Sequence, residues 1–263
     1  MTIRVGVFGA GGRMGAEVCR AVAADPDVEL VAAVDPHHAG LDVRSVTGAD
    51  VARVSIAPEA SALADAGAEV AVDFTDITAA RENIRWCAAN SVHAVVGTTG
   101  FADGDIDEAR GAFTSSNCLI APNFAIGAVL MMRFAELAAP WFDTAEVIEL
   151  HHDQKIDAPS GTAIATAQRM AAASPEWNPD PTQSETIANA RGAKGPAGIP
   201  IHSVRLHGLV AHQEVLLGTT GQSLVIRHDS YDRTSFMPGV LLAVKSVAER
   251  PGVTVGLDAL LGL

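Results

Sequence analysis

Short apolar segments alternate with helix-like segments over residues 1–123. Aliphatic and β-branched residues dominate the apolar segments, as is typical of buried strands, whereas residues 36–66 show no clear periodicity. Because strands that alternate with helices form parallel βαβ units, this part of the chain predicts a doubly wound, Rossmann-like α/β sheet. We expect strands at 3–8, 27–34, 70–74, 93–96 and 118–121, and helices at 16–24, 79–89 and 105–115.

The pattern changes after residue 124. A run of three strand-like segments without a helix between them favours an antiparallel or mixed sheet, and therefore a second domain of the α+β class. In chain order we expect an apolar helix at 126–141, a strand at 145–150, a helix at 162–173, a proline-containing loop at 174–198, and strands at 199–206, 213–218 and 222–228.

The end of the chain is expected to return to the first domain, with a helix at 234–250 and a short strand at 253–255. The sequence thus predicts two domains. Residues 1–123 together with 232–263 would bind a dinucleotide, and residues 124–231 would bind substrate and form the surface for oligomerisation.

Composition narrows the class of protein. Hydrophobic residues make up 48% of the 263 positions and charged residues 19%, the profile of a soluble globular protein. No apolar run approaches the ~20 residues of a membrane span, and the first residues lack the features of a signal peptide, so a cytoplasmic location is expected. The three cysteines stand in apolar contexts and are interpreted as reduced core residues. A net charge of −13 argues against nucleic-acid and membrane partners.

A glycine-rich turn follows the first strand and precedes a helix. In that position glycines allow the backbone to approach a pyrophosphate at the helix start. The strict G-x-G-x-x-G pattern fails at Met14, but Gly9, Gly12 and Gly15 fit G-x-x-G-x-x-G. Asp35 lies 20 residues beyond Gly15, at the end of the second strand, where an acid binds the adenosine ribose hydroxyls. The turn therefore predicts a nicotinamide-dinucleotide site.

Two further strand ends carry small and polar residues. They read Gly97-Thr98-Thr99 and Ala121-Pro122-Asn123-Phe124. Turns of α/β sheets are rich in such residues in any case, but open sheets bind ligands at the carboxyl ends of their strands. We expect both segments to line the cofactor.

The polar and charged residues of segment 149–163 are not explained by the needs of the fold alone. The segment joins a buried strand to an alanine-rich helix and contains His151, His152 and Lys155, one of only three lysines in the chain. Adjacent histidines point in opposite directions on an extended chain, so one of them is expected to be structural. The cluster offers a general acid and a cation within a few residues.

Ser160, Gly161 and Thr162 open the helix that follows this cluster. Free N–H groups and the positive end of the helix dipole favour an anion there, such as a substrate carboxylate. Together with the cluster, this helix start predicts protonation and reduction of a small acidic molecule.

These motifs resemble the dihydrodipicolinate reductase (4-hydroxy-tetrahydrodipicolinate reductase) family of lysine and diaminopimelate biosynthesis, and its actinobacterial branch in particular. The resemblance covers nearly the whole chain. Its most specific segment is 149–162, and it rests further on 9–15, 96–100, 121–124 and 227–239.

The resemblance implies reduction of 4-hydroxy-tetrahydrodipicolinate, a small dicarboxylate, to tetrahydrodipicolinate by NADH or NADPH, in a homotetramer assembled through the sheet of the second domain. It assigns proton transfer to His151 and Lys155, and contact with substrate to His152, Ser160, Gly161 and Thr162. It places the cofactor against Gly9, Ala10, Gly11, Gly12, Arg13, Met14, Asp35, Gly97, Thr98, Thr99, Ala121, Pro122, Asn123 and Phe124.

One position departs from the family pattern. The family commonly carries an arginine after the acidic residue of the second strand, and Pro36 stands there in this chain. Asp35 repels the 2′-phosphate of NADPH, whereas His37, His38 and Arg13 could supply positive charge. The expectation is NADH preference or use of both cofactors.

Two other interpretations stay open at this stage. Another NAD(P)-dependent dehydrogenase of an aspartate-derived metabolite would also need a glycine turn and a cationic substrate pocket. A non-catalytic dinucleotide-sensing protein would keep the nucleotide fold without the chemistry. No metal site is expected, because the sequence has no HExxH motif and the neighbouring His151 and His152 could hardly both reach one ion on a strand.

Overall fold

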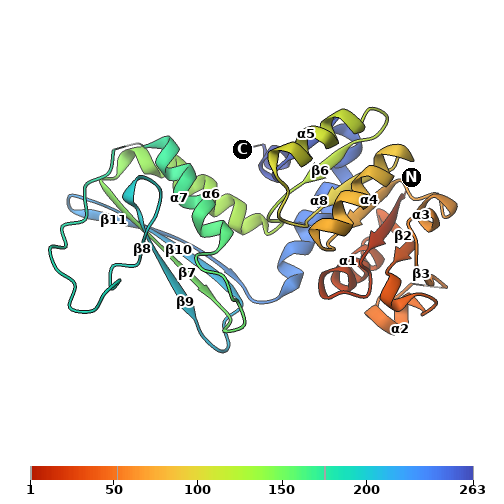
Figure 1. Ribbon diagram of the computed structural model, residues 1–263, viewed down its shortest axis with the longest axis horizontal. Helices are drawn as coiled ribbons and strands as arrows, with labels where there is room; N and C mark the ends of the chain where they lie inside the picture. The colour runs from red at the N-terminus through yellow and green to blue at the C-terminus, as the bar shows by residue number, and fades with distance from the viewer. Residues whose placement is uncertain (1, 52, 175, 263) are drawn as a thin grey trace. The chain divides into compact units, whose positions relative to one another are not determined.

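The computed structural model describes residues 2–51, 53–174 and 176–262. They form two compact units, which are coloured along the chain in Figure 1. Unit 1 comprises Met1–Phe124 and Phe236–Leu263, and unit 2 comprises Ala125–Ser235.

Unit 1 is built on a seven-stranded sheet in which all neighbouring strands are parallel. The order β12-β6-β5-β4-β1-β2-β3 contains the 3-2-1-4-5-6 order of dinucleotide-binding sheets, which confirms the predicted Rossmann-like class. The strands are β1 (Ile3–Phe8), β2 (Val28–Val34), β3 (Ile56–Ala57), β4 (Val70–Asp73), β5 (His93–Val96), β6 (Cys118–Ile120) and β12 (Val253–Val255).

The helices of unit 1 flank this sheet (Figure 1). All four residues of β4 are buried, as expected where helices cover both faces of a parallel sheet. Aspartates begin two of the helices, since Asp76 accepts hydrogen bonds from Thr78 and Ala79 at the start of α4 and Asp42 caps α2. The helices are α1 (Arg13–Ala24), α2 (Val43–Thr47), α3 (Ser61–Asp65), α4 (Ile77–Ala89), α5 (Asp103–Ala112), α8 (Met237–Ser246) and α9 (Asp258–Leu261), with 3-10 turns η1 (Pro36–His38) and η5 (Val247–Glu249).

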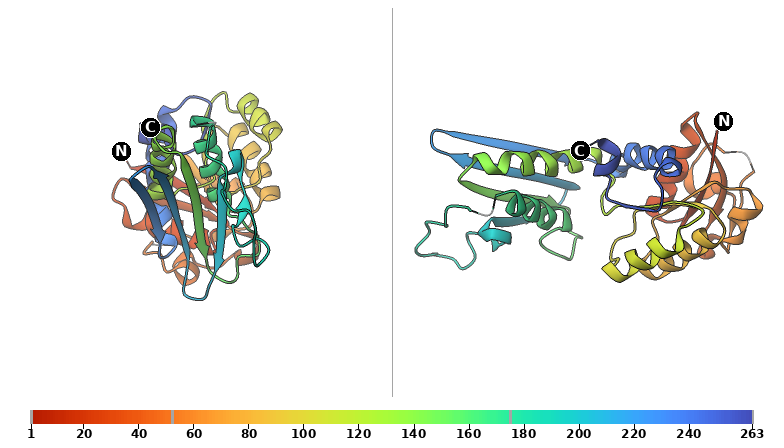
Figure 2. Two further views of the ribbon diagram at one scale, coloured as in Figure 1. Left: turned by 90° about the vertical axis from the view of Figure 1, so that its left-hand side faces the viewer. Right: turned by 90° about the horizontal axis from the view of Figure 1, so that it is seen from above.

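Unit 2 contains a five-stranded mixed sheet in the order β11-β10-β7-β9-β8. Strands β7 and β9 run parallel, and the other neighbours run antiparallel. Figure 2 shows the long strands side by side, and Figure 1 shows two helices lying along the sheet. The elements are α6 (Ile126–Ala138), η2 (Ala139–Trp141), β7 (Thr144–His151), α7 (Gly161–Ala173), β8 (Ala193–Lys194), η3 (Pro196–Gly198), β9 (Pro200–Arg205), β10 (Ala211–Thr219), β11 (Gln222–Ser230) and, reaching the boundary with unit 1, η4 (Arg233–Phe236).

Strand β7 has one buried and one half-exposed side. Ala145, Val147 and Glu149 are buried, and the residues between them are partly exposed. Buried and partly exposed residues thus alternate along β7. A shift of the strand by one residue would exchange its two faces, so the alternation determines which side chains lie toward the helices. The buried side is therefore the one that carries Glu149 toward α7.

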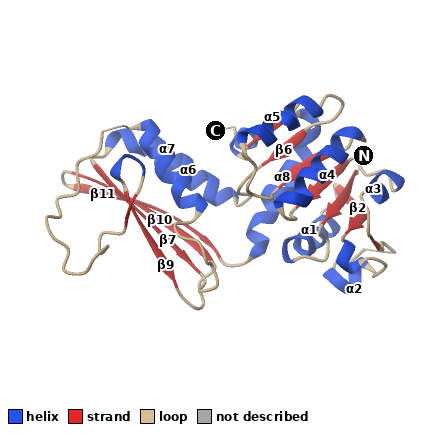
Figure 3. Cartoon of the chain, viewed as in Figure 1, coloured by secondary structure: helices blue, strands red, loops and turns tan. Residues whose placement is uncertain are grey.

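Three segments differ from the sequence-based expectation. The helix expected at 234–250 is interrupted: η4 precedes α8, whose first turn holds Pro238, and η5 follows it. The loop expected at 174–198 is largely irregular in its described part (Figure 3), but β8 pairs with β9 and η3 follows. The elements α2, β3, α3 and α9 span five residues or fewer, too few for periodicity to reveal.

None of the helices formed by the described residues has the length and apolar character that a bilayer crossing requires.

Candidate functional site

Glu149 and His151 lie two residues apart at the end of β7, so their side chains share a face of the sheet. The backbone N–H of Ser160, at the start of α7, donates to Oε1 of Glu149 at 3.2 Å. Glu149 has no exposed surface, while the side chain of His151 keeps 16%. His152, one residue beyond the strand, is exposed. The structure therefore separates the two histidines into a half-buried one and an exposed one.

The carboxylate of Glu149 is surrounded by donors. Nη1 and Nη2 of Arg205 donate to Oε2 and Oε1 at 2.9 Å each, and Nδ1 of His151 lies 2.5 Å from Oε2. Burial raises the pKa of Glu149, but hydrogen bonds from Arg205, Ser203 and His151 outweigh it and hold that pKa below its ordinary value. Glu149 is thus ionised and can only accept hydrogen bonds. In its hydrogen bond with His151, the proton is therefore on Nδ1 of the imidazole.

The imidazole of His151 is neutral near pH 7. Burial lowers its pKa, the contact with Glu149 opposes that shift, and the net pKa lies below the ordinary 6.5. Because Nδ1–H is engaged by Glu149, Nε2 is the nitrogen left to accept a proton. A carboxylate that orients a histidine in this way is a common feature of acid–base sites.

Arg205 connects this carboxylate to the loop after β7. It ends β9 and lies opposite His151 in the parallel register. Its Nη2 donates to the carbonyl of Asp157 at 2.7 Å, and its Nε donates to the carbonyl of Lys155 at 3.3 Å. One guanidinium therefore holds both the buried carboxylate and the loop.

The side chain of Lys155 is held within the same loop. Its Nζ donates to both carboxylate oxygens of Asp157 at 2.8 Å, and 20% of the Lys155 side chain is exposed. The pKa of Asp157 is lowered mainly by its hydrogen bond from Lys155. The predicted proton donor is thus held by a carboxylate of its own loop.

The start of α7 is anchored at several points. The side chain of Ser160 accepts from the N–H of Ala163 at 3.2 Å, which is an N-cap. Nε2 of the buried Gln213, on β10, donates to the hydroxyl of Thr166 at 2.8 Å. A Cβ added at Gly161 would meet no atom of the described residues within 4 Å, so the backbone there faces open space. The helix start therefore has room for an anion.

Two contributors to this site were not assigned a role by the sequence. Glu149 stands in the motif, and its spacing of two from His151 on a strand is the signal that could have assigned it. Arg205 gives no such signal, because a single arginine 50 residues beyond Lys155 becomes a partner only through the parallel pairing of β7 and β9.

The glycine turn in unit 1 has the shape that a dinucleotide needs. Gly9 has φ +66, and a Cβ at Gly15 would lie 2.0 Å from the carbonyl oxygen of Gly9. Gly12 begins α1 without a side-chain cap, and the first turn contains no acidic residue. Arg13 is exposed at the first position of the helix. The N-terminus of α1 is therefore suited to a pyrophosphate.

The remaining predicted cofactor residues gather at the carboxyl edge of the sheet. Phe8, Val34, Asp73, Val96 and Ile120 pair in one register, so the turns after these strands lie along one edge. The exposed predicted residues there are Gly12, Arg13, Thr99 and Pro122; the buried ones are Ala10, Asp35, Thr98, Ala121 and Phe124; the others, Gly9, Gly11, Met14, Gly97 and Asn123, are half-buried.

Some of these side chains are engaged within the fold. The hydroxyl of Thr98 donates to Asp73 at 3.1 Å, and Phe124 packs against Phe74 with ring centroids 5.6 Å apart. Asp35 accepts from the N–H groups of Gly11 and His37, both at 2.9 Å. Thr98 and Phe124 therefore shape the edge, and contact with a cofactor there would come mainly from backbone groups.

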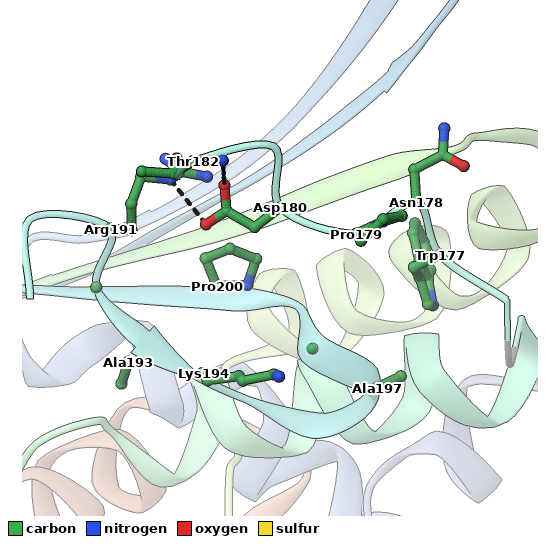
Figure 4. Close-up of a pocket in the computed structure, with 12 residues that line it drawn as sticks. Trp177, Asn178, Pro179, Asp180, Thr182, Arg191, Ala193, Lys194, Ala197 and Pro200 are labelled. Atoms are coloured by element: carbon green, nitrogen blue, oxygen red, sulfur yellow. Dashed lines mark hydrogen bonds and ion pairs between the residues drawn. The ribbon is translucent and has the colours of Figure 1, made fainter. Parts of the chain in front are cut away.

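A separate cavity of about 630 Å³ lies in unit 2 (Figure 4). Segments 177–182 and 191–200 line it, and Arg191 reaches across to Asp180 at 3.1 Å. None of the predicted site residues contributes to its lining. Within the described part of the chain, no group of three or more His, Cys, Asp or Glu side chains is placed to hold a metal ion.

Comparison with known proteins links both units to one family. The family model described as dihydrodipicolinate reductase, N-terminus, matches residues 3–124, and the model described as dihydrodipicolinate reductase, C-terminus, matches residues 127–261. The 4-hydroxy-tetrahydrodipicolinate reductase of Nocardia farcinica is 50% identical, covering 100% of both chains. That of Cutibacterium acnes is 48% identical, covering 99% of both chains.

A solved structure agrees with these matches. The dipicolinate-bound dihydrodipicolinate reductase from Paenisporosarcina sp. TG-14 superposes with a TM-score of 0.85 at 43% identity, over 98% of this chain and 99% of that one.

Proposed function

This chain belongs to the dihydrodipicolinate reductase family, and on that premise we propose how its residues reduce 4-hydroxy-tetrahydrodipicolinate to tetrahydrodipicolinate. The protein is an NAD(P)-dependent oxidoreductase of lysine and diaminopimelate biosynthesis. The observation that carries the proposal is the pair of buried Glu149 and partly buried Arg205, whose hydrogen bonds join His151, the loop of Lys155 and the start of α7.

The start of α7 binds a carboxylate of the substrate. Gly161 leaves open space against the backbone, and the helix N-terminus supplies positive potential. Ser160 and Thr162 flank that position, and the exposed His152 contacts the rest of the dicarboxylate. This arrangement compensates locally for the acidic character of the chain, which would otherwise repel an anionic substrate.

His151 and Lys155 manage the proton. The 4-hydroxyl of the substrate leaves as water. Hydride addition at C4 of the resulting ring leaves negative charge on the conjugated system, so one proton must reach the adjacent carbon. The ammonium of Lys155 donates a proton, and His151 exchanges one through Nε2 while Glu149 fixes its ring. Positioned acid–base groups of this kind contribute about 10²–10⁴-fold to rate.

The edge of the unit 1 sheet holds the nicotinamide cofactor, which supplies the hydride when bound. The glycine turn and the uncapped start of α1 receive the pyrophosphate, and Asp35 receives the adenosine ribose. NADH preference or use of both cofactors follows from the acid at position 35 and the proline after it. The other residues in this role are Gly9 to Met14, Gly97 to Thr99 and Ala121 to Phe124.

Assembly as a homotetramer through the sheet of unit 2 completes the proposal. Val225 on β11 is 54% exposed, and Leu206, just beyond β9, is 57% exposed. Large apolar side chains exposed on a sheet favour association with another copy. The three buried, unpaired cysteines support action in the reducing cytoplasm.

Oxidation of NADH and of NADPH, measured in parallel, tests the function. The substrate would be formed in place from pyruvate and aspartate semialdehyde by the preceding synthase. We expect rapid oxidation of at least one cofactor that depends on the synthase. Absence of oxidation of both, with folded and nucleotide-binding protein, would contradict the proposed reaction.

A further inference from the structure

The imidazole of His38 lies beside the carboxylate of Asp35, the group that we propose for the adenosine ribose. Its Nδ1 lies 3.2 Å from Oδ2 of Asp35 and is buried, yet it forms no hydrogen bond with any residue that the structure describes. A Cβ added at Gly11 would lie 2.2 Å from the same nitrogen, so the ring rests directly on the glycine turn. Glycine at position 11 therefore makes room for His38 as well as for a ligand.

The carboxylate of Asp35 keeps about half of its hydrogen-bonding capacity for the ribose. The N–H of His37 uses Oδ1, the N–H of Gly11 uses Oδ2, and the ring of His38 faces Oδ2. A carboxylate offers about four acceptor sites. One acceptor site on each oxygen therefore remains for a ribose diol, and the ring of His38 lies beside Oδ2.

A 2′-phosphate meets the same pair differently. Asp35 alone would repel it, whereas an imidazole N–H donates to a phosphate oxygen whether or not the ring is protonated. His38 already lies between the carboxylate and the open side of the turn, with 36% of its side chain exposed. From this place a ring N–H can donate to a phosphate carried by a ribose that Asp35 holds.

We propose that His38 is the residue that determines whether this chain accepts NADPH beside NADH, by donating to the 2′-phosphate of NADPH next to the carboxylate of Asp35. The inference rests on the proposed function, because it assumes that the adenosine half of the cofactor binds at Asp35. His38 takes the role that the arginine missing at Pro36 would have had.

The two other basic residues near the turn are less suited to this role. His37 is exposed, and it reaches Asp35 only through its backbone N–H, so its side chain is not directed to the carboxylate by that contact. Arg13 begins α1, the helix whose start we propose for the pyrophosphate. His37 is consequently a matched control, since its substitution leaves its backbone N–H in place.

Calorimetric titration with ADP-ribose and with 2′-phospho-ADP-ribose tests the inference, because neither ligand can react. In the full-length protein, H38A should lower the ratio of 2′-phospho-ADP-ribose affinity to ADP-ribose affinity by about tenfold, the effect of one hydrogen bond to a charged group. H38R should raise that ratio, and H37A should leave it within about twofold.

An unchanged ratio in both H38A and H38R, with tight binding of both ligands to the wild type, would overturn the role of His38 alone. An equal change in H37A and H38A would overturn it too, because the effect would then be one of general charge. Failure of the wild type to bind either ligand would overturn the proposed nucleotide site, and the role of His38 with it.

Discussion

Arg205 donates to both carboxylate oxygens of Glu149 at 2.9 Å, and Glu149 has no exposed surface. Two parallel hydrogen bonds between a guanidinium and a carboxylate combine strength with a fixed orientation. The same two side chains reach His151, the carbonyls of Lys155 and Asp157, and the first turn of α7. A buried ion pair is a poor source of net stability, so its value here lies in placing these groups.

Removing one partner of this ion pair should destabilise the folded protein. E149Q leaves the guanidinium of Arg205 without its counter-charge, and we expect a loss of about 3–5 kcal/mol in the free energy of unfolding. Urea unfolding measures it. The double variant E149M/R205M should recover much of that stability, since both charges are gone, but not kcat. Recovery of full kcat in the double variant would show that the pair has no positioning role.

The titration of His151 should depend on Glu149. Burial lowers the pKa of His151, and the hydrogen bond from Nδ1 to Glu149 raises it. E149Q weakens only the second effect, so the pKa of His151 should fall further. The ring C–H resonances of His151, followed by NMR against pH, report this directly. A shift toward higher pH would contradict the assigned contact.

Folding stability should decline as the pH falls from 7 toward 5.5. Burial is the main cause that lowers the pKa of His93, His151 and His228 below 6.5 in the folded protein. The unfolded chain then binds more protons than the folded one, so stability rises with pH through this window and is lost on acidification.

His93 offers a test of that pH dependence. Its Nδ1 accepts from the N–H of Asn117 at 2.9 Å and cannot do so once protonated. H93N retains an acceptor but does not titrate, so its unfolding free energy should vary less between pH 7 and 5.5. If the unfolding free energy of H93N varied with pH as much as that of the wild type, His93 would not be a source of the pH dependence.

Asp157 should matter for activity more than for stability. Its carboxylate binds Lys155 but is 63% exposed, and exposed ion pairs contribute at most about 1 kcal/mol. D157N should therefore leave the unfolding free energy nearly unchanged while lowering kcat several-fold, because Lys155 loses its fixed position. Equal kcat in the variant and the wild type would show that the pair is incidental.

The glycine turn should not tolerate a side chain at its closest contact. In G15A the new Cβ would lie 2.0 Å from a backbone oxygen, so we expect a destabilisation of about 1–3 kcal/mol and weaker binding of NADH. G104A is the matched control, since it lies in α5 with no atom within 4 Å and exchanges glycine for a better helix former. Thermal unfolding and NADH titration compare the two.

The sequence predicted the bounds of those strands that depend only on local residues. The bounds of β1, β5 and β12 agree with the expected segments, because short β-branched runs between turn residues have few alternatives. The family, the reductase function and the Rossmann-like class are confirmed by the fold and by the full-length relatives. Those relatives are named as reductases of this family, which favours neither the dinucleotide-sensing protein nor the other dehydrogenase.

The side-chain contacts that build the site could not be predicted from local sequence. Arg205 meets Glu149 only because β7 and β9 pair in parallel across a connection that contains α7. Likewise, the contact between His38 and Gly11 joins two turns that follow different strands. Spacing along the chain carries no information on such contacts, which depend on strand order and register. The roles of the individual site residues stay predictions.

The most direct measurement compares turnover with cofactor affinity in K155A, using K194A as the control at another lysine of unit 2. We expect K155A to lower kcat by about 10²-fold or more, the contribution of a positioned acid, while its Kd for NADH stays within about twofold of the wild type. K194A should change neither quantity. Full turnover in K155A, or an equal loss of turnover and cofactor affinity, would contradict the assignment of Lys155 as proton donor.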